Sequence, residues 1–182
     1  MIKEASWIIY TTFLYSLTGN TLEIIVIIWT MIILILMCLY RFLKIDKSKL
    51  FNLGFLLLYT SFLLFFLVIG REKRTTRDFD LIPFHSYIVL FSDYSLRHVL
   101  ELVMNIAMFI PFGYYLVKLN KVMRFRTFQV VLIGVFISMI FETMQYVFNR
   151  GLLEVDDIVN NSLGFFLGVQ IGKGKIDNDK EL

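Results

Sequence analysis

The feature that most constrains this chain is a run from Leu22 to Tyr40 whose one acidic side chain lies at its edge. A helix rises about 1.5 Å per residue, so about 20 apolar residues cross the hydrocarbon core of a bilayer. The segment from Leu50 to Gly70 is of the same kind. The whole sequence agrees, because 58% of its residues are hydrophobic and its mean hydropathy is +0.72, which is too apolar for a soluble domain of this size. We therefore predict an integral membrane protein.

Three further segments are apolar overall but contain polar residues: Val99 to Val117, Thr127 to Phe148 and Ile158 to Gly172. With the first two they predict an all-α fold, a polytopic membrane helix bundle with about five transmembrane helices. The aromatic segment from Ala5 to Thr18 has no basic leader and no small-residue cleavage site, so we expect an interfacial helix there rather than a signal peptide.

The predicted organisation has three parts. Residues 1–70 hold the interfacial segment and two spans, residues 71–172 hold a loop and three spans, and residues 173–182 form a polar cytoplasmic tail. The lone cysteine, Cys38, lies inside the first predicted span, which excludes an internal disulfide and a cysteine-based metal cluster. The formal charge of +3 is too small and too unevenly placed to indicate nucleic-acid binding.

The distribution of lysine and arginine predicts the orientation, because these residues are retained on the cytoplasmic side of a membrane. Eleven of the 18 lie in Arg41 to Lys49, in Lys118 to Arg126 and in the tail from Lys173. The other seven lie on the opposite side, most of them in the loop from Arg71 to Arg97. The count favours an N-terminus outside the cell and a C-terminus inside it.

Polar side chains repeat along one face of the fourth predicted span. Ser138, Glu142, Gln145 and Asn149 are spaced four, three and four residues apart, so they form a single stripe on a helix. A charged carboxylate that faces lipid is costly, so an acid within a span usually faces other helices or a water-filled cavity. The stripe therefore indicates a pocket. The alternative is that these groups only hydrogen bond to one another and hold the helices together.

Matching polar groups occur near the starts of the third and fifth spans. Glu101 and Asn105 form one pair at helical spacing, and Asp157 and Asn161 form another. With the N-terminus outside, both pairs lie at the same outer level of the membrane as Glu142. We therefore expect the polar groups of three spans to meet under the outer surface.

Two backbone features accompany these groups. Gly164, Gly168 and Gly172 repeat every four residues, a small-residue stripe that lets a neighbouring helix approach closely, and we expect that helix to be the fourth span. Pro111 lies inside the third span and is expected to bend or break it. Two interpretations are open: a simple kink, or a break that opens space for a ligand beside Asn105.

The loop between the second and third spans combines clustered cations with the apolar segment "LIPF". Such a loop is expected to lie at the membrane interface and to cover the pocket. Its arginines suit phosphate or carboxylate groups, through charge-assisted and often bidentate contacts. We assign this role to Arg77, whereas Arg71 and Arg74 have the alternative role of neutralising nearby acids and lipid phosphates.

Several kinds of chemistry have no support in the sequence. It contains no P-loop, no Gly-rich dinucleotide turn and no G-x-S-x-G elbow, so we predict no cofactor. His98 and Glu101 are spaced to share a helix face, and His85 is a third potential ligand. A histidine at a helix entrance is more often a cap or an anchor, so we predict no metal site.

Three segments of the chain, taken in their order along the sequence, resemble the VanZ-like family of bacterial membrane proteins, the teicoplanin resistance protein family. The resemblance rests on "FDLIPFHSY", "ELVMNIAMFIPFG" and "FETMQYVFNRGLLEVDDIVNNSLGFFLG" and runs from about Arg71 to Gly172. Asp80 and Glu154 depart from the family pattern, in which Asn and Asp are common at these places. The resemblance implies a multi-pass protein of the bacterial cytoplasmic membrane with a role in resistance to teicoplanin-like glycopeptides.

The leading hypothesis is an envelope protein that binds a lipid-linked or amphiphilic anionic ligand, with membrane lipids, a lipid-linked cell-wall precursor or a lipoglycopeptide as partner. Arg77 would contact the head group, and Asp156 and Asp157 would fix Arg150 or bind a cation. One alternative is a membrane hydrolase or transferase with Glu142 or Asp157 as acid or base. Another is a structural subunit held together by its polar groups. The predicted ligand-binding residues are Arg77, Asn105, Glu142, Gln145, Arg150, Asp156, Asp157 and Asn161.

Overall fold

The computed structural model describes residues 20–43, 46–93, 96–119 and 126–181. The predicted interfacial segment, Ala5 to Thr18, lies outside these residues. Nearly all of the described chain is helical, which confirms the predicted all-α class. The helices are α2 (Asn20–Leu43), α3 (Lys47–Leu64), α4 (His85–Asp93), α5 (Leu96–Leu119), α6 (Thr127–Val147) and α7 (Val155–Glu181), with one π-helical turn, η1 (Phe65–Ile69), continuing α3.

Three of the described helices are long and apolar enough to cross a membrane: Lys47–Ile69, His98–Leu119 and Thr127–Val147. They match the second, third and fourth predicted spans. The apolar stretch in α2, Ile27–Phe42, is shorter. The remaining predicted span belongs to α7, which is long but begins with polar residues. The fold is thus a helical membrane bundle, and the predicted count of five spans is approximate.

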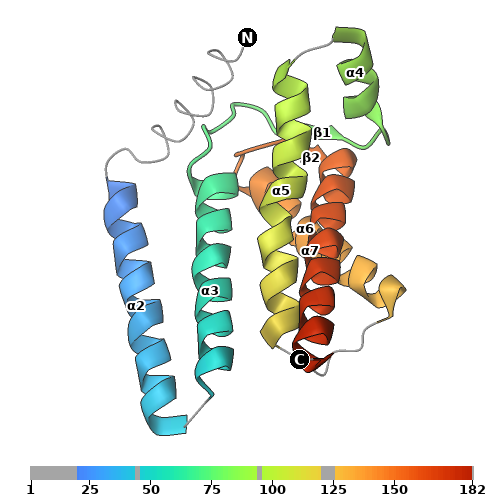
Figure 1. The fold of residues 1–182 in the computed structure, drawn as a ribbon. Helices are drawn as coiled ribbons and strands as arrows, with labels where there is room; N and C mark the ends of the chain where they lie inside the picture. The colour runs from blue at the N-terminus through green and yellow to red at the C-terminus, as the bar shows by residue number, and fades with distance from the viewer. Residues whose placement is uncertain (1–19, 44–45, 94–95, 120–125, 182) are drawn as a thin grey trace.

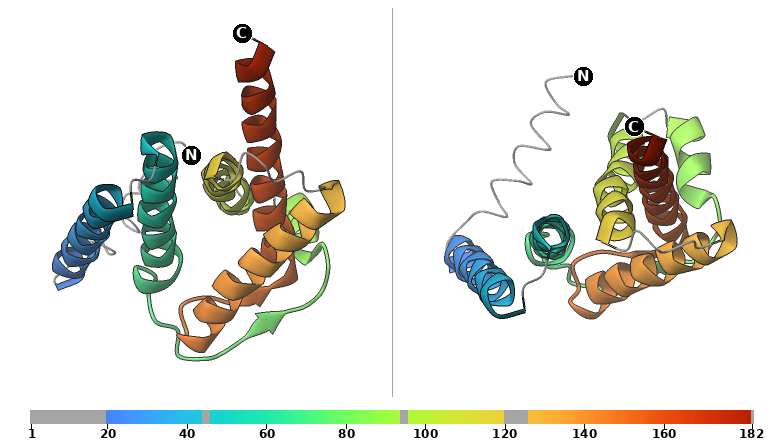
Figure 2. Two further views of the ribbon diagram at one scale, coloured as in Figure 1. Left: turned by 90° about the horizontal axis from the view of Figure 1, so that it is seen from below. Right: turned by 60° about the horizontal axis from the view of Figure 1, so that its bottom comes forward.

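At the centre of the bundle α5 and α7 lie side by side, with α6 crossing α7 and with α3 and then α2 on the other side of α5 (Figures 1 and 2). Gly164 and Gly168 of α7 face the backbone carbonyls of Ile106 and Ile110 of α5, and a Cβ at either glycine would overlap them. Gly113 of α5 is equally tight against the backbone of α7. The glycine stripe therefore packs on the third predicted span, and the expectation that it packs on the fourth is wrong.

Glycine explains this choice of partner, because both helices of the α5–α7 pair lack side chains where their backbones meet. The contact between α6 and α7 has a small residue on the α6 side, where Gly134 lies against the Phe165 ring. Phe109 of α5 and Phe141 of α6 pack edge to face, with ring centroids 5.5 Å apart, an arrangement that aromatic rings favour. These contacts form a shared apolar core. The helix α5 also runs without a break through Pro111.

Two strands of two residues each, β1 (Phe79–Asp80) and β2 (Leu153–Glu154), pair in parallel, with Phe79 opposite Leu153 and Asp80 opposite Glu154. The strand pair joins the loop after η1 to the link between α6 and α7. It was not predicted from the sequence. Because of this pair, the loop lies across the same end of the bundle as α4 (Figure 1).

Candidate functional site

Three of the four residues of the predicted stripe are buried in α6 against α7, whereas Asn149 lies in the turn after α6 and is only partly buried. Ser138, Glu142 and Gln145 are 0%, 1% and 2% exposed. Asn161 of α7 donates from Nδ2 to the Ser138 hydroxyl at 3.0 Å, and Gln145 Nε2 lies 3.5 Å from Glu142 Oε1. The other Glu142 oxygen lies 3.5 Å from the backbone nitrogen of Glu154. We call these four side chains, Ser138, Glu142, Gln145 and Asn161, the polar layer.

Two arginines, Arg71 and Arg150, contact the polar layer at Gln145. Arg71 follows the C-cap of η1 and donates from Nη1 to Gln145 Oε1 at 3.0 Å. Arg150 donates its backbone N–H to the Gln145 carbonyl at 2.8 Å and its side chain to the Arg71 carbonyl. A Cβ on Gly151 would collide with Gln145 Oε1 and crowd the Arg71 guanidinium. The turn after α6 is therefore fitted around Gln145 and Arg71.

The start of α4 is fixed on α7 by an acidic side chain. Asp156 is buried and accepts hydrogen bonds from the backbone N–H groups of Phe84, at 2.7 Å, and Ser86, at 2.8 Å. An acid that binds free N–H groups at the first turn of a helix stabilises that helix. The Tyr87 hydroxyl adds a bond to Asn160 Oδ1 at 2.5 Å. Asp156 thus positions the loop, and the predicted contact with Arg150 is not observed.

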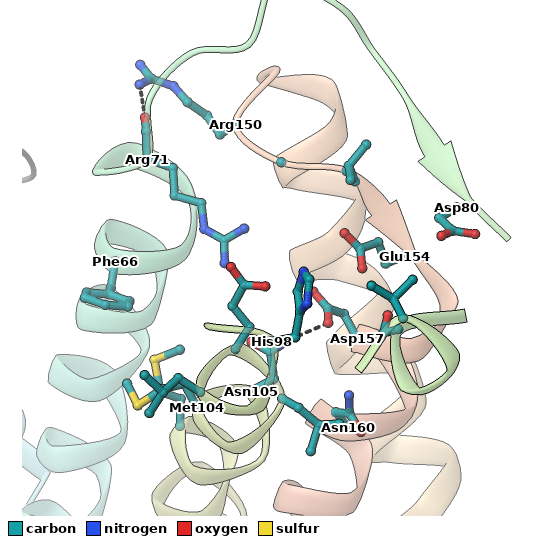
Figure 3. A pocket seen from close by; sticks show the side chains of 18 of the residues that line it. Phe66, Arg71, Asp80, His98, Met104, Asn105, Arg150, Glu154, Asp157 and Asn160 are labelled. Atoms are coloured by element: carbon teal, nitrogen blue, oxygen red, sulfur yellow. Dashed lines mark hydrogen bonds between the residues drawn. The ribbon is translucent and has the colours of Figure 1, made fainter. Parts of the chain in front are cut away.

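Under this loop lies a cavity of about 840 Å³, bounded by the end of α3, the loop with β1 and α4, the start of α5 and the α6–α7 link. Figure 3 shows Arg71 and Arg150 on one side of it and Asp80, Glu154 and Asp157 on the other. Apolar side chains complete the wall: Phe66 from η1 and Met104 lie below the arginines in Figure 3, and Met108, like Met104, comes from α5.

The structure divides the predicted ligand-binding residues into two groups. Asn105, Arg150 and Asp157 line the cavity, and Asn105 Nδ2 donates to Asp157 Oδ1 at 2.5 Å. Of the others, Arg77 is exposed and donates to Asn149 Oδ1 at 2.7 Å. The remaining four are buried and do not line the cavity: Glu142, Gln145, Asp156 and Asn161.

Charge and burial act strongly on Glu154, the second residue of β2. Burial, together with the neighbouring carboxylates of Asp157, Asp80 and Glu101, raises the pKa of its carboxyl to about 7, against the opposing effect of Arg71. A carboxyl with this pKa is partly protonated at neutral pH. It changes charge readily when a cation approaches or leaves.

His85 and Asp80 form an ion pair on the α4 side of the cavity. The hydrogen bond with Asp80 raises the pKa of His85, and the same bond lowers the pKa of Asp80. The pair therefore holds α4 against β1 in its charged form. In the described part of the chain no group of three or more His, Cys, Asp or Glu residues is arranged to hold a metal ion.

Sequence reasoning left several cavity residues outside the predicted site. Arg71 was given a neutralising role, Glu101 was noted only as one of the polar groups at the outer level, and Asp80 and Glu154 only as departures from a family pattern. The one available signal was that both departures add negative charge to the same face. Asp80 and Glu154 lie opposite each other in the β1–β2 pair, so both add negative charge to the same part of the cavity wall.

The fold and the site together define a class of protein: a bundle of membrane helices with a charged cavity at one end. The family model of VanZ/LLP1 matches residues 24–173, so the chain belongs to this family. Protein VanZ of Enterococcus faecium is 33% identical over 72 residues, which are 39% of this chain and 43% of that protein. The chain thus matches less than half the length of this relative. No solved structure matches.

Proposed function

We propose that this chain is a VanZ-like protein of the bacterial cell envelope that binds a lipid-linked or amphiphilic ligand in the cavity. We propose further that it contributes to resistance to teicoplanin-like glycopeptides. The observation that carries the proposal is the composition of the cavity wall. Charged groups from the loop, the α6–α7 link and the starts of α5 and α7 share one space with apolar side chains from η1 and α5. An amphiphile likewise combines a polar head group with an apolar chain.

The apolar part of the wall suits an acyl or prenyl chain. Met104 and Met108 are unbranched and adaptable, so they accept chains of varied shape. The Phe66 ring is contributed by η1, the π-helical turn that continues α3. A cavity of about 840 Å³ is within the usual range of about 300 to 1,000 Å³ for small-molecule sites.

The proposed orientation has the N-terminus outside and the C-terminus inside. It follows from the count of cations, and it is supported by their location in the fold. The α2–α3 turn, the end of α5 and the C-terminus all lie at the end of the bundle opposite to α4 (Figure 1). The cavity then opens on the outer side of the membrane, where glycopeptides meet lipid-linked cell-wall precursors.

The test is the susceptibility of a sensitive Gram-positive host to teicoplanin. Cells expressing the wild type are expected to be more resistant than cells with an empty vector. Asp157→Asn is expected to remove the difference at equal membrane abundance. Lys73→Gln, on an exposed residue outside the cavity, is the matched control and is expected to keep it. Equal susceptibility of wild-type and empty-vector cells would refute the resistance role.

A membrane hydrolase or transferase is the second candidate, because the Asp157 carboxylate lines the cavity and is available as an acid or base. Glu142, the other predicted acid or base, is buried behind the wall. An enzyme of this kind would change the amounts of envelope lipids or cell-wall precursors. Identical lipid and precursor profiles in cells with wild type and Asp157→Asn would rule out this candidate.

A further inference from the structure

The wall of the cavity holds more negative than positive groups. Five carboxylates line it, against three guanidiniums and the imidazole of His85, which is paired with Asp80. A ligand whose head group is only anionic would therefore meet a net negative surface, and like charges brought together in an interface are strongly unfavourable. The carboxylates are those of Glu72, Asp80, Glu101, Glu154 and Asp157, and the guanidiniums are those of Arg71, Arg74 and Arg150.

The two kinds of charge lie at different places. Arg71 and Arg150 come from the end of η1 and the turn after α6, whereas Asp80, Glu154 and Asp157 come from β1, β2 and the start of α7, across the cavity (Figure 3). A head group that spans the cavity therefore meets Arg71 and Arg150 at one end and Asp80, Glu154 and Asp157 at the other. The other two carboxylates lie elsewhere, Glu72 next to Arg71 in the loop and Glu101 near the start of α5, and Arg71 is close enough to act on Glu154 as well.

Glu154 is a half-buried carboxylate of the cavity wall. Within the described part of the chain, its backbone N–H has a hydrogen bond, to Glu142, but its carboxylate has none. Burial and the nearby acids oppose its ionisation. An ammonium group at this position would favour the charged form and remove the repulsion between Glu154 and Asp157.

We propose that the ligand is a zwitterionic amphiphile, with a phosphate near Arg71 and Arg150 and a primary ammonium near Glu154 and Asp157. Its chain leaves between α3 and α5, past Met104. This inference rests on the proposed function, because it names the ligand class of the same cavity. It replaces the anionic ligand that was expected from the sequence. Two sources share this chemistry: an aminophospholipid, and a prenyl-linked cell-wall precursor whose peptide carries a free amine.

The experiment measures binding of defined amphiphiles to the full chain, purified in a non-ionic detergent, by isothermal titration calorimetry. The probes are dioctanoyl phosphatidylethanolamine, its N-acetylated form and dioctanoyl phosphatidylglycerol. We expect the free amine to bind at least about ten-fold more tightly than the other two, because only it brings the positive charge. A second pair of probes, a lysine-containing prenyl diphosphate precursor and its N-acetylated form, distinguishes the two sources.

The variants assign the preference to the acidic side of the cavity. Glu154→Gln is expected to abolish most of the preference for the free amine, and Glu154→Asp, which keeps the charge, is expected to retain it. Arg150→Gln is expected to weaken the binding of all phosphate-bearing probes. The preference in the wild type is measured with no substitution, so it does not depend on whether any variant folds.

The outcomes separate this inference from the proposed function. Equal or tighter binding of the N-acetylated or anionic probes would overturn the zwitterion and leave an amphiphile-binding protein. A preference for the amine that survives Glu154→Gln in folded protein would also overturn the assignment. Failure of all five probes to bind would overturn both proposals.

Discussion

The polar layer and the wall of the cavity lie at the same end of the bundle, but their polar groups are placed in different surroundings. In the layer, Ser138 is bonded to Asn161 and Gln145 to Glu142, and these side chains are almost fully buried. In the wall, charged groups such as Glu154 and Asp157 face an open volume. The comparison teaches that the polar residues of the fourth predicted span build the bundle, whereas the charge that faces the cavity comes from the links between helices and from the starts of α5 and α7.

Two contacts connect the regions: a long one of 3.5 Å between the Glu154 backbone nitrogen and Glu142, and a shorter one through Gln145. Gln145 belongs to the layer, and its oxygen accepts from Arg71, which lines the cavity. A change in the layer can therefore disturb the cavity. A change on the far side of the cavity is expected to leave the layer intact.

Gln145→Leu is expected to have the largest effect on stability. It removes the acceptor for Arg71 and the amide next to Glu142, and it leaves the buried Glu142 carboxyl and the half-buried Arg71 guanidinium with fewer polar partners. Removal of a hydrogen-bond partner from buried polar groups costs about 1–3 kcal/mol and more for charged ones. Thermal unfolding in detergent measures the loss, and Lys73→Gln is the control. An unchanged unfolding temperature would mean that the layer contributes little to the fold.

The sequence predicted the polar layer because helical periodicity is local. Residues three and four apart share a face in any helix, so the stripe from Ser138 to Gln145 was visible without the fold. The cavity was less predictable. Its wall depends on the pairing of Asp80 with Glu154 across two short parallel strands, and a strand of two residues leaves no periodic pattern. The packing of α5 on α7 was missed for a similar reason, because a glycine stripe does not identify its partner helix.

Glu154→Gln is expected to act mainly on binding. The free-amine preference described above should fall by about ten-fold, the equivalent of about 1.4 kcal/mol, while the polar layer remains folded. The Glu154 backbone N–H, which lies near Glu142, is unchanged by the substitution. If Glu154→Gln lowers the unfolding temperature as much as Gln145→Leu does, the polar layer and the cavity wall contribute equally to stability and the distinction between them is wrong.

The same variant is expected to change the pH dependence of stability. The native pKa of Glu154, about 7, is above its ordinary value of 4.5, so the folded state binds this proton more tightly than the unfolded state does. The stabilisation is complete below the unfolded pKa and is lost as pH rises through 7. We expect it to be about 1 kcal/mol, because part of the side chain is solvated.

Unfolding temperatures of the wild type and Glu154→Gln at pH 5, 6.5 and 8 check this effect. The wild type should lose more stability than the variant between pH 5 and pH 8. Any pH dependence of stability that remains in the variant is due to other titratable side chains. Parallel curves would show that Glu154 is ionised in the native protein at pH 5, against the raised pKa.

Asp78→Asn is expected to have the smallest effect, and it tests whether the cavity or the whole loop carries the charge that matters. Asp78 lies 3.6 Å from Arg74, and both side chains are well exposed. Exposed pairs of this kind contribute about 0–1 kcal/mol, so stability should hardly change. Amine preference should also be unchanged, because Asp78 does not line the cavity. If Asp78→Asn lowers the preference as much as Glu154→Gln, the net charge of the loop attracts the ligand and the cavity wall is not what selects it.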